Sequence, residues 1–283
     1  MTSSSTPLLV GLIGAGIQDS RAPALHECEG RANGLDYQYR LFDLEALGVG
    51  IEALPELLVR AEREGFAGLN ITHPCKQAVI PLLTDLSAEA RAIGAVNTVV
   101  LRDGRRIGHN TDWSGFAESF RRGLPDVAVN SVVQLGAGGA GAATAFAALK
   151  LGFEQLAIFD IDHNRAQQLA EKLNTQFEGE RAAAVSDLDA AMTGVEGLIH
   201  ATPTGMASHS GLPLPANLLR PEMWVAEIVY FPLETELLRT AREIGCRTLN
   251  GSGMAVFQAA EAFQLFTGMS PDVRRMRQYF GRA

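Results

Sequence analysis

The sequence contains little cysteine, no excess of positive charge and no long apolar run. Its three cysteines, Cys28, Cys75 and Cys246, are too few and too widely spaced for a disulfide framework or a zinc knuckle. Unpaired cysteines are typical of a reducing compartment, so we expect a cytoplasmic protein. The 24 Lys and Arg residues are scattered and outnumbered by 32 Asp and Glu residues, which predicts no nucleic-acid partner.

Signals for membrane insertion and metal binding are also missing. The apolar run that begins at Leu8 ends at Gly14-Ala15-Gly16, which is too short to cross a bilayer, and the preceding residues Met1 to Thr6 are expected to be a polar tail. The six histidines show no spacing that would place two of them on one helix face. We therefore expect neither a membrane partner nor a metal site.

What is present is the composition of an ordinary globular protein, with 47% hydrophobic and 20% charged residues. A chain of 283 residues is long enough for two modest domains. Short apolar runs alternate with longer helical patterns, which predicts βαβ units and an α/β fold with mostly parallel sheets. The expected strands are Leu8–Ile13, Tyr37–Asp43, Ala67–Thr72, Val132–Leu135, Leu156–Phe159, Gly197–His200 and Val225–Ile228.

Turn signals divide the chain into two expected domains. Residues 97–101 and 106–109 flank Arg102-Asp103-Gly104-Arg105 and predict a small hairpin that closes the first sheet. Helical periodicity breaks at 122–126, so the second domain is expected to begin with a helix near Asp112. We predict a first domain of residues 1–111, a second of residues 112–253, and helices within 254–283 that complete the first.

A glycine-rich loop follows the strand that ends at Leu135. Gly136, Gly138 and Gly141 satisfy the pattern G-x-G-x-x-G, which allows a tight turn, close approach of backbone to pyrophosphate and close packing of helix on strand. The helix N-terminus adds amide donors and a positive dipole end. A plain strand-to-helix turn is the alternative. The pattern predicts dinucleotide binding by Gly136, Ala137, Gly138, Gly139, Ala140 and Gly141.

The acidic residue Asp160 ends the next strand, roughly 20 residues beyond the loop, where a ribose-binding carboxylate is expected. Its charge would repel the 2′-phosphate of NADP, and no Arg follows it immediately, although Arg165 lies nearby. NAD is therefore the predicted cofactor. The alternative is that Arg165 reaches the phosphate of NADP.

An earlier glycine pair, Gly14 and Gly16, also looks like a dinucleotide loop, but Asp19 occupies the third glycine position. A carboxylate there would face the pyrophosphate unfavourably. We interpret the pair as a turn that delivers Ser20 to a substrate pocket, with a second cofactor loop as the alternative.

Three polar residues stand out elsewhere in the chain. Lys76 follows a predicted strand end, the edge at which open parallel sheets bind ligands, although a surface lysine in a first helical turn is the alternative. Asp112 is a second candidate, and its alternative role is that of a helix N-cap, a common use of Asp at the start of a helix. Gln258 lies in a predicted helix, where an inward-facing amide needs a partner.

Taken in order, these segments resemble the shikimate dehydrogenase family, including its quinate/shikimate branch. The resemblance extends from Leu8 to Gly268, and it is carried by the segments 70–76, 94–98, 108–115, 201–206 and 229–235. It implies a mixed α/β substrate-binding domain beside a Rossmann NAD-binding domain. The implied activity is hydride transfer between NAD and a hydroxylated ring carboxylate, shikimate or quinate.

The resemblance also implies roles for individual residues. Hydride loss from a ring carbon must accompany loss of the hydroxyl proton, and Lys76 with Asp112 is the implied catalytic pair. Whether Lys76 alone accepts the proton or shares it with Asp112 stays open. The implied substrate contacts are Ser20, Thr72, Asn97, Gln258 and Tyr230, and the implied nicotinamide pocket is shaped by Thr202, Met206 and Gly253 together with Tyr230.

One position departs from the family pattern. Many members hold the substrate carboxylate with two hydroxyl residues that flank one other residue, but here the segment is Ser20-Arg21-Ala22. A hydrogen bond to a charged group is worth about 1.5–3 kcal/mol, so the preferred acid stays open and includes a modified acid such as an amino-shikimate. A methylene-tetrahydrofolate dehydrogenase is a weaker alternative, because this chain has no tyrosine spaced before Lys76 to match that enzyme's pattern. A non-catalytic NAD-binding sensor stays open as a second alternative, and so does a homodimer as the assembly.

Overall fold

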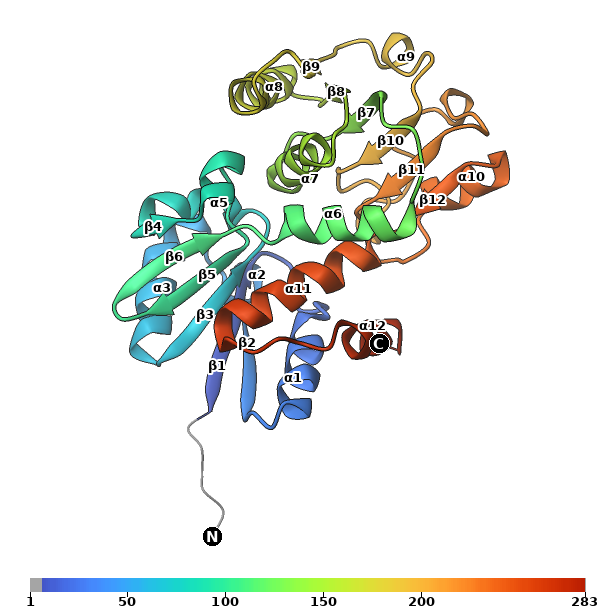
Figure 1. The fold of residues 1–283 in the computed structure, drawn as a ribbon. Coiled ribbons are helices and arrows are strands. Elements are labelled where there is room, and N and C mark those ends of the chain that lie inside the picture. Colours follow the sequence, from blue (N-terminus) through green and yellow to red (C-terminus); the bar gives the residue numbers. More distant parts are fainter. Residues whose placement is uncertain (1–6, 283) are drawn as a thin grey trace. The chain divides into compact units, whose positions relative to one another are not determined.

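The computed structural model describes residues 7–282, so the predicted polar tail at residues 1–6 lies outside the described residues. The chain forms two compact units, labelled by element in Figure 1. The first contains the chain up to Thr111 and again from Val256 onward, and the second is Asp112–Ala255. Within residues 7–282, no helix combines the length and apolarity needed to cross a membrane.

The first unit is built on a six-stranded mixed sheet with the order β2-β1-β3-β5-β6-β4. β1 pairs in parallel with β2 and β3, whereas β5 is antiparallel to β3 and β6. The strands are β1 (Leu8–Gly14), β2 (Tyr37–Asp43), β3 (Phe66–Ile71), β4 (Asp85–Leu86), β5 (Thr98–Arg102) and β6 (Arg105–His109).

The helices of this unit cover the sheet and supply its connections. They are α1 (Ala22–Ala32), α2 (Leu44–Leu47), α3 (Leu54–Arg63), α4 (Cys75–Ala78), α5 (Ala88–Ile93), α12 (Val273–Arg282), the later part of α11 (Ser252–Thr267), and the 3₁₀ turns η1 (Ile51–Ala53) and η2 (Ile80–Leu82). The sequence of α3 explains why it forms an amphipathic helix. Its apolar residues recur at helical spacing and are all buried, namely Leu54, Leu57, Leu58 and Ala61. Figure 1 shows α1 beside α12.

The hairpin between β5 and β6 is confirmed, but its predicted place at the edge of the sheet is wrong. Asp103 and Gly104 have φ angles of 52° and 70°, as a two-residue type I′ turn requires. Beyond β6, however, the two-residue strand β4 pairs in parallel at Asp85 and Leu86. Its preceding residue Thr84 donates its hydroxyl to the carbonyl of Arg106 at 2.8 Å. Tertiary hydrogen bonding therefore creates a strand too short to leave a sequence pattern.

The second unit is a parallel six-stranded sheet with the order β12-β11-β10-β7-β8-β9. This is the order of a dinucleotide-binding Rossmann fold, with its switch point beside β7. The strands are β7 (Ser131–Leu135), β8 (Gln155–Phe159), β9 (Ala182–Ala184), β10 (Gly197–His200), β11 (Trp224–Glu227) and β12 (Arg247–Leu249). The short strands β9 and β12 were not among the strands expected from the sequence.

Helices pack on this second sheet and fix its carboxyl edge. They are α6 (Asp112–Gly123), α7 (Gly139–Lys150), α8 (His163–Phe177), α9 (Leu188–Ala191), α10 (Glu236–Ile244), the beginning of α11, and the 3₁₀ turn η3 (Ala216–Leu218). Figure 1 shows α7 and α8 beside the β7–β8–β9 half and α10 beside β11 and β12. Residues Gly141 to Leu149 of α7 are all buried, because a run rich in alanine lets the helix pack closely on every side.

Candidate functional site

The glycine loop of the second unit joins β7 to α7. Gly136 has a φ of 100°, and a Cβ atom there would lie 2.5 Å from the carbonyl oxygen of Ala201. A Cβ on Gly141 would overlap the carbonyl of Gly136. Two of the three glycines are therefore required by the turn and by close packing of helix on strand.

Gly138 differs from these two, because a Cβ atom there would meet no protein atom within 4 Å. It is the N-cap residue of α7, where no side chain bonds to the helix N-terminus. Packing within the protein therefore does not explain this glycine, whereas close approach of a pyrophosphate does. Gly139 and Ala140 follow in the first turn of α7, and this geometry fits a dinucleotide cofactor.

The side chain of Gln134 on β7 holds the glycine loop by hydrogen bonds, a role that the sequence analysis missed. This fully buried side chain donates to the carbonyl oxygens of Gly136 and Gly141 at 2.8 and 2.9 Å. The hydroxyl of Thr144 donates to the Gln134 amide oxygen at 2.9 Å. A polar residue inside an otherwise apolar strand just before a glycine-rich turn was the available signal.

Asp160 lies beside the glycine loop at the end of β8. Its carboxylate accepts the backbone amides of Ala137 at 2.7 Å and Asp162 at 2.9 Å. The guanidinium of Arg165 lies 3.8 Å from the same carboxylate and 3.6 Å from Asp162. A positive charge therefore lies beside Asp160 even though no Arg follows it immediately in the sequence, and the Arg165 side chain is half exposed.

The remaining cofactor candidates lie on the other side of β7. Since Asp160 follows β8, the adenosine half of a dinucleotide is expected toward β8 and the other half toward β10 and β11. Thr202 and Met206 belong to the loop after β10, and Tyr230 belongs to the loop after β11. Gly253, in the first turn of α11, packs so closely on α6 that a Cβ would overlap the hydroxyl of Ser119, so packing alone requires a glycine there.

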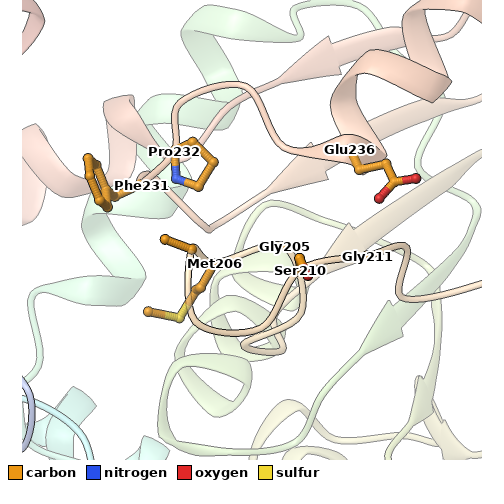
Figure 2. A pocket seen from close by; sticks show the side chains of 8 residues that line it. Gly205, Met206, Ser210, Gly211, Phe231, Pro232 and Glu236 are labelled. Carbon is orange, nitrogen blue, oxygen red and sulfur yellow. The ribbon is translucent and has the colours of Figure 1, made fainter.

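A pocket of about 270 Å³ lies between these two loops of the second unit. Its lining includes Gly205, Met206 and Ser210 from the first loop, Phe231 and Pro232 from the second, and Glu236 at the start of α10. Figure 2 shows the side chains of Met206 and Pro232 on facing sides of it. Met206 and Phe231 are 42% and 47% exposed, which leaves apolar surface available to a ligand.

In the first unit, polar side chains gather where β3 ends and the antiparallel strand β5 begins. The amide of Asn97 donates to the Thr111 hydroxyl at 2.9 Å and lies 3.4 Å from the amide oxygen of Gln258. The structure therefore brings Asn97 and Gln258 together, although they are far apart in the sequence. Lys76, half-buried in α4, is attached to the same edge because its carbonyl accepts the amide of Val96 at 2.8 Å.

The segment that carries Ser20 lies against the segment that carries Thr72. The amide of Ala15 donates to the carbonyl of His73 at 2.9 Å, and a Cβ on Gly14 would overlap the side chain of Thr72. Ser20 is half-buried, and its hydroxyl accepts the amide of Ala22 at 3.3 Å. Ser20 and Thr72 are thereby placed at the same edge of the first sheet.

Asp43, a second residue that sequence reasoning missed, holds the Ser20 segment. Its carboxylate accepts the amides of Gly16 and Ile17 at 2.9 and 3.1 Å and the side chain of Gln18 at 2.9 Å. Burial alone would raise the pKa of Asp43, but these hydrogen bonds and one from the amide of Glu45 lower it. Because a carboxylate already occupies these amides, the Gly14–Gly16 turn is a poor site for a second pyrophosphate.

The two predicted catalytic residues belong to different units. Lys76 lies in the first unit, and Asp112, buried with 6% of its surface exposed, is the first residue of α6 in the second. Asp112 therefore lies inside the helix rather than before it as an N-cap. Among residues 7–282, no group of His, Cys, Asp and Glu side chains is arranged to hold a metal ion.

Comparison with known proteins identifies the family. Residues 12–99 match the model of the shikimate dehydrogenase substrate binding domain, and residues 251–278 match that of the shikimate 5′-dehydrogenase C-terminal domain. The shikimate dehydrogenase (NADP⁺) of Streptomyces avermitilis is 60% identical, over 95% of this chain and 93% of its own length. The quinate/shikimate dehydrogenase (NAD⁺) of Corynebacterium efficiens is 49% identical, over 96% and 97%.

A solved structure extends the similarity to the whole fold. Quinate dehydrogenase from Corynebacterium glutamicum, in complex with NAD, is 46% identical and superposes with a TM-score of 0.91, covering 98% of this chain and 99% of that one. Similarity at this level across both units confirms the α/β fold expected from the motifs. The chain belongs to the shikimate dehydrogenase family.

Proposed function

We propose that this protein oxidises shikimate, quinate or both to the 3-dehydro acid and passes the hydride to a nicotinamide dinucleotide. The observation that carries the proposal is family membership along nearly the whole chain. The relative from Streptomyces avermitilis is named for shikimate, and the relative from Corynebacterium efficiens is named for quinate and shikimate.

The polar cluster of the first unit is proposed to bind the ring acid. Asn97, Gln258 and Thr72 supply amide and hydroxyl groups that match ring hydroxyls, and Ser20 supplies a hydroxyl for the carboxylate. Tyr230 of the second unit is the fifth proposed contact. The Asn97 amide is already oriented by Thr111, which favours binding because little side-chain freedom is lost.

Lys76 and Asp112 are proposed as the catalytic pair. Lys76 takes the proton of the substrate hydroxyl as the hydride leaves, and Asp112 either orients the ammonium group or shares the proton. The short helix that carries Lys76 is fixed at its first residue, since Cys75 is fully buried and its amide donates to the carbonyl of Thr72 at 2.8 Å. A lysine on such a support is positioned for proton transfer.

The proposed cofactor residues are the loop from Gly136 to Gly141, Asp160, Thr202, Met206 and Gly253. When bound, the nicotinamide ring accepts the hydride. Asp160 favours NAD because its carboxylate would repel a 2′-phosphate, whereas Arg165, 3.8 Å away, offers a charge that suits NADP. We propose NAD as the preferred cofactor, because Asp160 is hydrogen-bonded to the glycine loop, whereas the Arg165 side chain is half exposed.

A substrate panel tests this proposal. Reduction of NAD and of NADP is measured with shikimate, quinate and amino-shikimate as separate substrates, and NAD turnover with at least one of the first two is expected. Turnover with amino-shikimate alone would favour the modified acid, the candidate that Ala22 supports. Cofactor binding without turnover of any acid would instead identify a non-catalytic sensor.

The proposal also covers the cellular location and the assembly of the protein. Cys28, Cys75 and Cys246 are unpaired thiols, which suits a cytoplasmic protein. A homodimer is the proposed assembly, and light scattering of the purified protein measures it.

A further inference from the structure

Two ionisable side chains are buried at the ends of neighbouring strands in the second unit. His200 ends β10, Glu227 ends β11, and the two residues are paired in the parallel register. The Nδ1 atom of His200 lies 2.9 and 3.0 Å from the two carboxylate oxygens of Glu227. His200 is 0% exposed and Glu227 is 2% exposed.

Each member of the pair also bonds to the loop that follows its own strand. His200 Nε2 lies 2.5 Å from the Thr202 hydroxyl, which also accepts the amide of Thr204. Glu227 accepts the amide of Val229 at 2.9 Å and the hydroxyl of Thr235 at 3.1 Å. The carboxylate therefore binds both ends of the loop after β11, while the imidazole binds the beginning of the loop after β10.

The two loops also pack on one another above this pair. Gly205, from the first loop, has a φ of 94°, and a Cβ there would lie 3.4 Å from the Thr235 side chain. Thr235 in turn caps α10 by accepting the amide of Leu238 at 3.2 Å. The pocket shown in Figure 2 lies between these loops. The pair thus fixes the two walls of that pocket relative to each other.

Fold stability does not account for the pair. Replacing two buried, hydrogen-bonded polar groups with apolar groups of the same shape can be nearly neutral or stabilising, because desolvation of the polar groups offsets the gain from their hydrogen bond. What an apolar pair cannot do is bond to Thr202, Val229 and Thr235 together. Fixing the positions of the loops is therefore the effect that distinguishes these two residues.

We propose that His200 and Glu227 are positioning residues for the nicotinamide half of the cofactor. They hold the loops after β10 and β11 in the arrangement that receives the ring, on the side of β7 opposite to Asp160. The adenosine half rests on the glycine loop and does not depend on them. This inference rests on the proposed function, because it requires a nicotinamide dinucleotide as the ligand.

The test compares two ligands that differ by the nicotinamide ring. Affinities for NAD and for ADP-ribose are measured by calorimetry on the wild-type protein, Glu227→Gln and His200→Gln. Each variant is expected to bind NAD about tenfold more weakly, the effect of losing one hydrogen bond to a charged group, and to bind ADP-ribose as the wild type does. kcat is expected to fall with NAD affinity, because a misplaced ring lies badly for hydride transfer.

His26→Gln is the matched control. His26 is another buried histidine with a single hydrogen bond, 3.0 Å to the hydroxyl of Tyr37, and it lies in the first unit. It should leave both affinities unchanged. If Glu227→Gln does not fold, Thr235→Val, which removes one hydroxyl and keeps the pair, is judged by the same two affinities.

Two results would overturn the proposal. Unchanged affinity for both ligands means that the pair does not position the ring, and an equal loss for both means that it only supports the fold. Failure of the proposed function would look different. The wild-type protein would then turn over neither shikimate nor quinate, while the two affinities would still report on the pair.

Discussion

The carboxylate of Asp160 accepts a hydrogen bond from the backbone amide of Ala137 at 2.7 Å. This bond ties the end of β8 to the glycine loop after β7. The Asp160 side chain is 7% exposed, whereas that of its neighbour Arg165 is 53% exposed. The acidic group is thus fixed by the backbone, and the basic group is held only by surface charge, a weak restraint.

We expect Asp160→Ala to raise the preference for NADP relative to NAD about tenfold. Removing the carboxylate removes repulsion of the 2′-phosphate, and 1.4 kcal/mol corresponds to one decade. Ratios of kcat/KM for the two cofactors measure the effect. Asp162→Ala is the control, because Asp162 also lies near Arg165, at 3.6 Å, but is half exposed. An unchanged ratio in Asp160→Ala would remove this residue from cofactor selection.

Lys76→Ala and Asp112→Asn should each reduce turnover by about 10² to 10⁴, as loss of a general acid–base group does. Initial rates at saturating substrate measure the loss, and thermal unfolding shows that the variants are folded. Lys172→Ala, which removes an exposed lysine on α8, serves as the control. Near-normal turnover in both folded variants would refute the catalytic assignment.

Ala22→Ser should lower the KM for shikimate by up to roughly tenfold, because it restores a second hydroxyl for the carboxylate. Turnover should change less, since a contact away from the reacting carbon stabilises ground and transition states alike. Arg21 is directed elsewhere, as its guanidinium donates to the carbonyl of Phe280 at 3.1 Å and lies over that ring.

Ala32→Ser, at the exposed end of α1, is the control for the Ala22 variant. Unchanged KM values for shikimate and quinate in Ala22→Ser would mean that another group, such as a water molecule, already supplies the contact. Ala22 would then not determine specificity.

Asp43→Asn should weaken the hydrogen bonds that hold the segment carrying Ser20. The free energy of unfolding at pH 7 should therefore fall by about 1.5–3 kcal/mol, the contribution of hydrogen bonds to a charged group. The pKa of Asp43 is lowered in the folded state, so its stabilising effect is complete above the unfolded pKa, near 3.9, and is lost as the pH falls through the folded pKa. Urea unfolding at pH 7 and at decreasing pH below about 4 measures this. A difference from the wild type that persists at the lowest pH would contradict it.

Local sequence was sufficient for those features that depend on neighbours along the chain. The Gly136–Gly141 loop, the Asp103-Gly104 turn and the amphipathic helix α3 follow from backbone conformation and periodicity, which short segments encode. The alternation of strands and helices likewise predicted mostly parallel sheets, as the second unit has. The motif order along the chain was enough to indicate the family.

Only the tertiary structure decided which distant side chains meet. Asn97 and Gln258 are brought together by the return of α11 to the first unit, and β4 exists because β6 offers it an edge. Asp43 and the His200–Glu227 pair act through hydrogen bonds to distant segments or to backbone groups, and the residue types of those partners do not reveal the contacts. Gln134 likewise acts through backbone carbonyls of the glycine loop, although its place in an apolar strand was a signal. Local conformation depends on residues that are neighbours in the chain. A buried polar group, in contrast, needs a hydrogen-bond partner, and the tertiary structure alone decides which group that partner is.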